Sequence, residues 1–454
     1  MPSAVVLQRP ASGLLVHLEH VLIPILPAGS TILLGLSGGV DSVVLLHLLQ
    51  QLSSRHNWHL SALHVHHGIS PHADAWAAFC MELGAKMAVP VQVERVDIMP
   101  LRELGIEAAA RQLRHAALAR QALDFVALAH HADDQAETLL LQLLRGAGVR
   151  GVSAMPLIKY RTGAPALVRP LLDVQRAVLI DYAQQHALQW VEDESNADDA
   201  YPRNFLRHRV LPLVEQRFAA YRETLARSAR HFSEASALLD ELAQQDAQTV
   251  LNAESLDVAK LRMLSGVRGK NLLRYFIALR GAPMPDSTRL QEILRQLCQA
   301  RQDAHVSIAW QGWQICRYQD RAYVLPSAPP LTSSILWQGA WQGEAVIHLP
   351  QPYGILQFSS AVGQGISVTK LQSKALTIRR RQGGETIRPH AARPQRSLKN
   401  LLQEGALPPW QRDAWPLLFC GDDLVYVPTI AMACTYQAQP EEAGVVISWQ
   451  PSKQ

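Results

Sequence analysis

Cysteine is scarce in this sequence and follows no pattern. Only five cysteines occur among 454 residues, and none lies in a CxxC pair: Cys80, Cys298, Cys316, Cys420 and Cys434. An odd number at wide spacing indicates neither a disulfide framework nor a zinc site. We therefore expect a reducing compartment.

Long apolar runs, an export signal and a strong charge of one sign are also missing. The start, Met1 to Pro10, lacks the basic residues and apolar core of a secretion signal, and no apolar run approaches the ~18 residues of a membrane helix. The sequence predicts a cytoplasmic protein without membrane contact. A net charge of +4 does not by itself indicate a nucleic-acid binder, whereas 48% hydrophobic and 18% charged residues are typical of a globular protein with a packed core.

Four short apolar runs recur at intervals near thirty residues in the first third of the chain, and helix-like stretches separate them. This spacing predicts an α/β fold in which a parallel sheet carries helices on both faces. The predicted strands are Thr31–Leu36, Leu60–Val65, Val91–Val96 and Phe125–Ala129, and the predicted helices are Val43–Leu52, Ala73–Met87, Glu107–Leu123 and Asp134–Leu144.

The length favours three domains, which we place at 1–217, 218–330 and 335–454. The second should be mainly helical, with no strand until Val306. A β-hairpin around Gln311-Gly312 and a third strand at Ala322–Leu325 should end it. Pro326–Ser334 is typical of a linker, and the rest predicts a small α+β domain.

The string Ser37-Gly38-Gly39-Val40-Asp41-Ser42 follows the first predicted strand directly and precedes a helix. Adjacent glycines let a ligand approach the backbone, and the unpaired N–H groups of a helix start favour an anion. The loop lacks the length and the lysine of a P-loop, which disfavours γ-phosphoryl transfer. Asp41 fits beside phosphates if it holds Mg²⁺ or caps the helix; a simple glycine-rich turn capped by Asp41 or Ser42 is the alternative.

Three further strings lie where the strands of this sheet should end. They are His64-Val65-His66-His67-Gly68-Ile69-Ser70, Glu107-Ala108-Ala109-Ala110-Arg111-Gln112-Leu113-Arg114-His115, and Ala129-His130-His131-Ala132-Asp133-Asp134-Gln135-Ala136-Glu137-Thr138. The histidines of the first lack a carboxylate at metal-ligand spacing. Glu107 and Arg111 of the second could form a surface ion pair, or the arginine could face a reacting phosphate. A helix cap at Asp133 explains only part of the third.

The SGGVDS string resembles the motif of the N-type ATP pyrophosphatases, which cleave ATP between its α and β phosphates and adenylate a carbonyl oxygen. The other strings, with Leu144-Arg145-Gly146-Ala147-Gly148-Val149-Arg150-Gly151, are similar to successive motifs of one branch, the tRNA(Ile)-lysidine synthetases. The same branch is matched by Trp190, Asp193, Ser195, Asn196, Arg203, Asn204, Arg207 and Pro212. His115 departs from it, since the family more often has Tyr there.

This resemblance implies ATP-dependent joining of free L-lysine to C2 of the wobble cytidine of a tRNA(Ile) with a CAU anticodon, through an adenylated base. It places ATP on Ser37, Gly38, Gly39, Val40, Asp41, Ser42 and His64, and Mg²⁺ on Asp41. Catalytic roles fall to Asp41, Arg111, His130 and Arg145. Substrate binding falls to Arg114, His131, Asp134, Glu137, Arg203, Asn204 and Arg207. Pairing into a homodimer is left open.

The C-terminal part also resembles this family, in its tRNA-binding domain, through Thr377-Ile378-Arg379-Arg380-Arg381-Gln382-Gly383-Gly384-Glu385 and the segment around Pro408-Pro409-Trp410 and Trp415-Pro416-Leu417. Arg379, Arg380 and Arg381 are the predicted phosphate contacts. Trp410 and Trp415 could stack on unpaired bases or could belong to the core.

Two alternatives compete with this hypothesis. A tRNA thiolase shares the adenylation step but usually needs a cysteine pair, which the sequence lacks. A non-catalytic tRNA-binding protein would have no use for Asp41 among phosphates.

Overall fold

The computed structural model describes residues 13–301, 304, 306–327, 334–405, 407–412 and 414–452. Met1–Pro10, most of the predicted linker Pro326–Ser334 and the side chains of Glu107, Ser195 and Asn196 lie outside the described residues. The chain forms two compact units, one ending at Glu241 and the other beginning at Leu242. The division falls within the long helix α10 (Tyr221–Val250).

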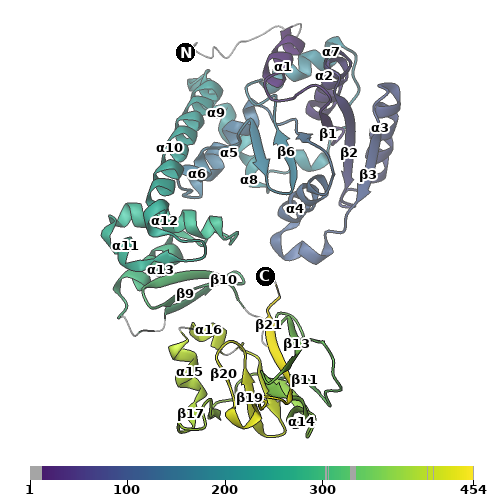
Figure 1. Ribbon diagram of the computed structural model, residues 1–454. Coiled ribbons are helices and arrows are strands. Elements are labelled where there is room, and N and C mark those ends of the chain that lie inside the picture. The colour runs from purple at the N-terminus through teal and green to yellow at the C-terminus, as the bar shows by residue number, and fades with distance from the viewer. Residues whose placement is uncertain are drawn as a thin grey trace. The chain divides into compact units, whose positions relative to one another are not determined.

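The first unit is built on a six-stranded sheet of order β3-β2-β1-β4-β6-β5 (Figure 1). All neighbouring pairs are parallel except β5 with β6. The predicted parallel sheet is confirmed, but β5 and β6 were not predicted. The strands are β1 (Thr31–Gly35), β2 (His59–His66), β3 (Val91–Arg95), β4 (Phe125–Ala127), β5 (Ile158–Arg161) and β6 (Ala164–Val168).

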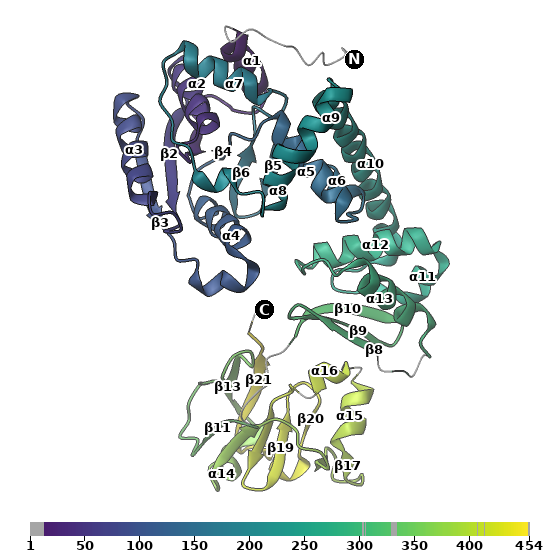
Figure 2. The ribbon, with the colours of Figure 1, turned by 180° about the vertical axis from the view of Figure 1, so that it is seen from behind.

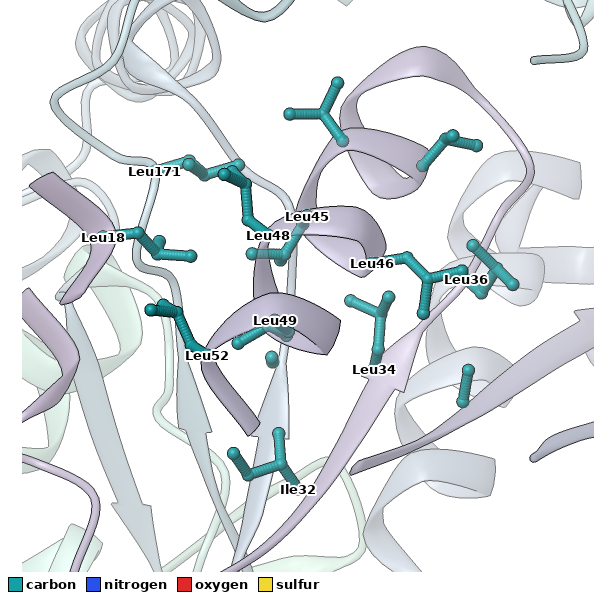
Figure 3. Close-up of a cluster of buried hydrophobic side chains, with 14 of the residues drawn as sticks. Leu18, Ile32, Leu34, Leu36, Leu45, Leu46, Leu48, Leu49, Leu52 and Leu171 are labelled. Carbon is teal, nitrogen blue, oxygen red and sulfur yellow. The ribbon is translucent and has the colours of Figure 1, made fainter. Parts of the chain in front are cut away.

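Helices cover both faces of this sheet. Successive side chains of β1 point to opposite faces, and its three central residues are all buried, so both faces must be covered. Ile32 and Leu34 pack against leucines of α1 and α2 on one face (Figure 3), whereas Leu33 packs with Leu118 of α4 on the other. Figure 2, seen from behind, shows α4 well apart from α1, α2 and α7. The helices around the sheet are α1 (Leu14–Leu22), α2 (Val40–His56), α3 (Ala73–Lys86), α4 (Ile106–Ala119), α5 (Ala132–Leu144), α6 (Val149–Val152) and α7 (Arg176–Gln185).

Short helical segments connect α7 to α10. They are the 3₁₀ turn η3 (Glu194–Ala197), α8 (Pro202–Phe205), the π-helical turn η4 (Leu206–Val210) and α9 (Leu211–Arg217); another 3₁₀ segment, η2 (Met99–Leu104), precedes α4.

The second unit begins with a helical layer on a four-stranded sheet of order β7-β10-β9-β8. The predicted hairpin and third strand are confirmed, but the expectation of no strand before Val306 was wrong. Leu256 and Asp257 form β7, which pairs with Ala322 and Arg321 of β10. A strand of two residues is too short to show the alternation of apolar and polar residues that predicts a strand. The elements are α11 (Val258–Met263), α12 (Gly266–Leu279), α13 (Ser287–Gln299), β8 (Val306–Trp310), β9 (Trp313–Tyr318) and β10 (Arg321–Pro326).

The end of the chain is rich in strands, with three short helices, as predicted. A five-stranded sheet of order β11-β15-β18-β19-β20 and a four-stranded sheet of order β12-β13-β21-β14 share one core around Leu356, Ile378 and Leu418. A two-stranded sheet, β16 with β17, completes it. The elements are β11 (Ile335–Gly339), β12 (Val346–His348), β13 (Ile355–Val362), β14 (Ile366–Ser367), α14 (Val368–Leu371), β15 (Leu376–Arg379), β16 (Thr386–Ile387), β17 (Arg396–Ser397), α15 (Leu398–Glu404), α16 (Pro409–Arg412), β18 (Leu417–Cys420), β19 (Asp423–Val427), β20 (Ala431–Met432), η5 (Cys434–Tyr436) and β21 (Ala443–Gln450).

All five cysteines are free thiols. Among the described helices, none combines the length and the apolar character needed to cross a membrane.

Candidate active site

The glycine-rich loop joins the central strand β1 to α2. The helix begins at Val40, three residues earlier than predicted, so Asp41 and Ser42 lie in its first turn. Gly39 is the N-cap and no side chain caps the helix, so the expectation that Asp41 or Ser42 could serve as the cap was wrong. Because first-turn amides have no partner within a helix, the N–H groups at this end remain available to an anion.

Gly38 shows why this loop needs glycine. Its φ of +88° favours glycine, and a Cβ there would lie 2.8 Å from Val191 Cγ2. Val191 N also donates to the Gly38 carbonyl at 3.0 Å. The segment after α7 therefore packs directly onto the loop and fixes its backbone.

Asp41 has an incompletely satisfied carboxylate. Its Oδ1 is buried without a hydrogen-bond partner among the described residues, and its ionic neighbours, Arg176 Nε and His131 Nε2, are each 3.7 Å away. Burial raises the pKa of Asp41, and the opposing effect of His131 and Arg176 is smaller. A buried anionic oxygen beside a helix start whose amides are available to an anion suits a hard cation, because Mg²⁺ is commonly held by one or two carboxylates together with substrate phosphates.

A cavity of about 660 Å³ opens at the carboxyl ends of β1, β2 and β4. In open parallel sheets this edge is where ligands bind. The predicted site residues that line it are Ser37, Asp41, Ser42, His64, Arg111, Arg114, His130, Asp134, Arg203, Asn204 and Arg207. The structure thus brings together residues from five separate sequence strings.

Several predicted site residues lie elsewhere. Arg145 follows the last residue of α5, is exposed and does not line the cavity. Glu137 and His131 are buried and do not line the cavity either. Arg379, Arg380 and Arg381 belong to the second unit.

Two carboxylates of α5, Asp134 in the cavity lining and Glu137 outside it, hold two arginines. Glu137, with a side chain 1% exposed, accepts from Arg203 Nε at 2.6 Å and from Arg207 Nε at 2.7 Å. Arg203 Nη2 also donates to Asp134 Oδ1 at 2.7 Å. Burial would raise the pKa of Asp134, but His131 and Arg203 outweigh it and lower that pKa to about 2. These acids therefore fix the two guanidinium groups at the cavity edge.

His131 and Asp134 form the capping box of α5. Asp134 N donates to His131 Nδ1 at 3.4 Å, and His131 N donates to Asp134 Oδ2 at 3.0 Å. Asp133, expected as a cap, instead accepts from Arg176 N at 2.9 Å and pairs with Arg222. It ties α5 to α7 and α10.

Three histidines at the end of β2 and just after it line the cavity, and two of them have hydrogen-bond partners. His64 Nδ1 lies 3.0 Å from the Leu36 carbonyl, and His66 Nε2 lies 3.2 Å from Asp74 Oδ1. His67 lines the cavity, and burial lowers its pKa to about 4, with Arg114 adding to the effect. Within the described part of the chain, no group of three His, Cys, Asp or Glu residues is arranged to hold a metal ion.

Sequence reasoning missed two basic residues near this site and gave a third, His115, no role in it. Arg169, 5% exposed, follows β6, and burial lowers its pKa to about 10. An arginine at the end of a buried strand could have indicated this position, but β6 was not predicted from the sequence. Arg176, at the start of α7, had no sequence signal. Burial also lowers the pKa of His115 to about 4, with Arg111 and Arg114 adding to the effect.

In the second unit, the predicted basic string is partly engaged in packing. The Arg379 guanidinium lies 3.9 Å from the centroid of the Phe419 ring and pairs with Glu385 at 3.5 Å. Trp410 packs edge-on against Tyr318 and Tyr323.

Trp415 packs edge-on against Trp449 and donates its Nε1 hydrogen to the Pro428 carbonyl at 3.1 Å. These contacts favour the core alternative for Trp415.

The fold and the loop between β1 and α2 define the class of this protein. Residues 15–214 match the model of the PP-loop domain, and residues 256–323 and 376–449 match the TilS substrate binding domain and the TilS substrate C-terminal domain. The chain belongs to the tRNA(Ile)-lysidine synthase family.

Curated relatives extend this likeness over nearly the whole chain. The tRNA(Ile)-lysidine synthase of Nitrosomonas europaea is 44% identical over 94% of this chain and 93% of its own, and that of Coxiella burnetii is 38% identical over 94% and 95%. Among solved structures, a U34-tRNA thiolase from Methanococcus maripaludis matches with a TM-score of 0.44 at 16% identity, over 49% of this chain and 79% of its own.

Proposed function

We propose that this chain joins free L-lysine to C2 of the wobble cytidine of a tRNA(Ile) with a CAU anticodon, consuming ATP and releasing AMP and pyrophosphate. The observation that carries this proposal is the juxtaposition of the lysine-free glycine loop with Asp41 and the arginines of one cavity. A loop without the P-loop lysine suits release of pyrophosphate better than transfer of the γ phosphate.

The residues of the cavity divide the work. The amides at the start of α2, with the hydroxyls of Ser37 and Ser42, whose Oγ atoms are 3.1 Å apart, suit the departing pyrophosphate. Asp41 would hold Mg²⁺, whose charge would offset that of the phosphates. Arg111 and Arg114, which line the same cavity from α4, suit the phosphate that stays with the base.

Two steps follow on the substrate. The C2 carbonyl oxygen of the cytosine attacks the α phosphate and the bond to the pyrophosphate breaks. The lysine ε-amine then attacks C2, AMP leaves with that oxygen, and the amine loses its proton. The target base must leave its stack to enter the cavity, which costs a few kcal/mol and requires contacts elsewhere on the tRNA. The basic strings are proposed to supply them, and the cytoplasm is the proposed compartment.

The test is incubation of the protein with ATP, labelled lysine and total tRNA. Label should enter only tRNA, only when a CAU isoleucine species is present, and one AMP should form for each lysine incorporated. Formation of ADP in place of AMP, or sulfur incorporation without lysine, would reject the proposal.

A further inference from the structure

Two histidines enter the cavity from the strands on either side of β1. His67 follows β2 and His130 follows β4, and both strands pair with β1. Both residues line the cavity together with Arg111 and Arg114. Only His130 was singled out from the sequence, where His67 read as the end of a histidine run.

In both rings the same nitrogen lacks a hydrogen-bond partner. Nδ1 of His67 and Nδ1 of His130 are each buried, with no hydrogen-bond partner among the residues that the structure describes. A buried N–H without an acceptor is rarer in proteins than an unsatisfied acceptor. The proton of each neutral ring is therefore expected on Nε2, which makes Nε2–H the hydrogen-bond donor of that ring.

The surroundings keep both rings neutral. For His67, burial is the main cause of a pKa of about 4, and Arg114 and the neighbouring His64 and His66 add to it. For His130, burial lowers the pKa to about 3; Arg169, Arg203 and Arg114 add to this, and Asp134 opposes it. Each ring therefore stays neutral across the working pH range and keeps one N–H that can donate a hydrogen bond.

A wall that combines such donors with guanidinium groups fits an anionic oxygen acceptor. We propose that His67 and His130 donate their Nε2 hydrogens to the oxygens of the adenylyl phosphate, alongside Arg111 and Arg114. This rests on the proposed function. Neutral donors aimed at a phosphate add hydrogen bonds without adding charge, so they stabilise the transferred group without competing for Mg²⁺ or repelling the lysine ammonium.

Amide substitutions test which ring nitrogen acts. A Gln side chain brings its NH₂ to about the position of Nε2, whereas Asn reaches only Nδ1. The variants are His67→Gln, His67→Asn and His67→Leu, with the same three at His130. Single-turnover conversion of ATP to AMP in the presence of tRNA should fall roughly 100-fold for Leu and Asn and less than roughly tenfold for Gln.

Three further measurements separate a donor role from a structural one. His59→Leu, at the exposed opposite end of β2, is the control and should keep the wild-type rate. Melting curves and ATP affinity of the variants should stay close to wild type. The pH profile between 5 and 8 should lose no ionisation when either histidine is replaced.

Equal rates for the Asn and Gln variants, full activity of the Leu variants, or an ionisation near pH 6–7 that vanishes with either ring would overturn the assignment. If the wild type incorporates lysine while the Leu variants do so normally, only this inference fails. If the wild type incorporates none, the proposed function itself fails.

Discussion

Asp41 serves binding at the expense of folding. Its pKa is raised from 3.8 in the folded state, mainly by burial, so its contribution to stability is fully present below pH 3.8 and is lost as pH rises through the raised value. At neutral pH the ionised carboxylate therefore destabilises the protein when no cation is bound.

Asp41→Asn should thus raise the melting temperature of the ligand-free protein at pH 7.5 by roughly 1–2 °C and abolish AMP formation. The gain should shrink as the pH falls through the raised pKa of Asp41, because the wild-type carboxyl then becomes protonated. Affinity for tRNA should stay within a few fold, also for Asp41→Ala. Melting scans at several pH values check the first point; a destabilised Asn variant at pH 7.5 would contradict it.

Glu137 tests the support of the cavity wall. Glu137→Ala removes the buried carboxylate that accepts from both Arg203 and Arg207 and leaves them only Asp134, and breaking a buried pair in this way costs about 3 kcal/mol or more. Denaturant unfolding should show that loss. The matched control is Glu215→Ala, which removes a half-exposed partner of Arg222 and should cost about 1 kcal/mol or less. Equal losses would argue against a supporting role for Glu137.

At the scale of elements, the turn before α2 depends on a backbone shape as well as on amides. Gly38→Ala would place a methyl group 2.8 Å from Val191 at a positive φ, and either the turn or the Val191 segment must move. We expect ATP affinity to fall at least roughly tenfold, since a shift near 1 Å at a reacting site can cost more than that. Isothermal titration with ATP measures it.

Gly163→Ala is the control for this effect. Gly163 also has a positive φ, of +69°, but a Cβ there meets nothing within 4 Å. It should lose about 1 kcal/mol of stability with ATP affinity unchanged. Loss of ATP binding in both variants would point to general destabilisation.

The elements that sequence could predict are those with a strong period. The strands from Thr31 to Ala129 are buried runs between amphipathic helices, and they were found. β6 was missed because Ala164–Val168 is separated from its neighbour β4 by two helices and the edge strand β5, so no βαβ spacing indicated it. Arg169 was missed with it.

For the site residues, too, the sequence predicted positions better than contacts. Residues adjacent to predicted strand ends, such as Asp41 and His130, were predicted to lie at the ligand edge of the sheet, and the structure places both in the cavity lining. The resemblance grouped Glu137 with ligand contacts, but in the structure both its oxygens accept hydrogen bonds from arginines. The hydrogen-bond state of His67 likewise depends on packing that no periodicity encodes.

For the whole molecule, salt dependence distinguishes basic residues that contact RNA from those that hold the fold. Changing Arg379, Arg380 and Arg381 together to Ala should weaken tRNA binding and reduce the slope of log affinity against log salt by roughly 1–2. The reduction should be less than three contacts would give, because Arg379 already packs on Phe419 and pairs with Glu385.

Binding titrations from low to moderate salt measure this slope. Arg379→Ala alone should lower the melting temperature with little change of slope. An unaltered slope in the triple variant would remove this string from the RNA contact surface.

The hydrogen bond from Val191 to Gly38 has a consequence for synthesis of the chain. The turn emerges from the ribosome about 150 residues before the segment that locks it. A nascent chain that ends before Val191 therefore carries every amide of the turn before α2 but lacks the hydrogen bond from Val191 that holds this turn. We therefore expect a chain truncated before Val191 to bind ATP more weakly than the full chain.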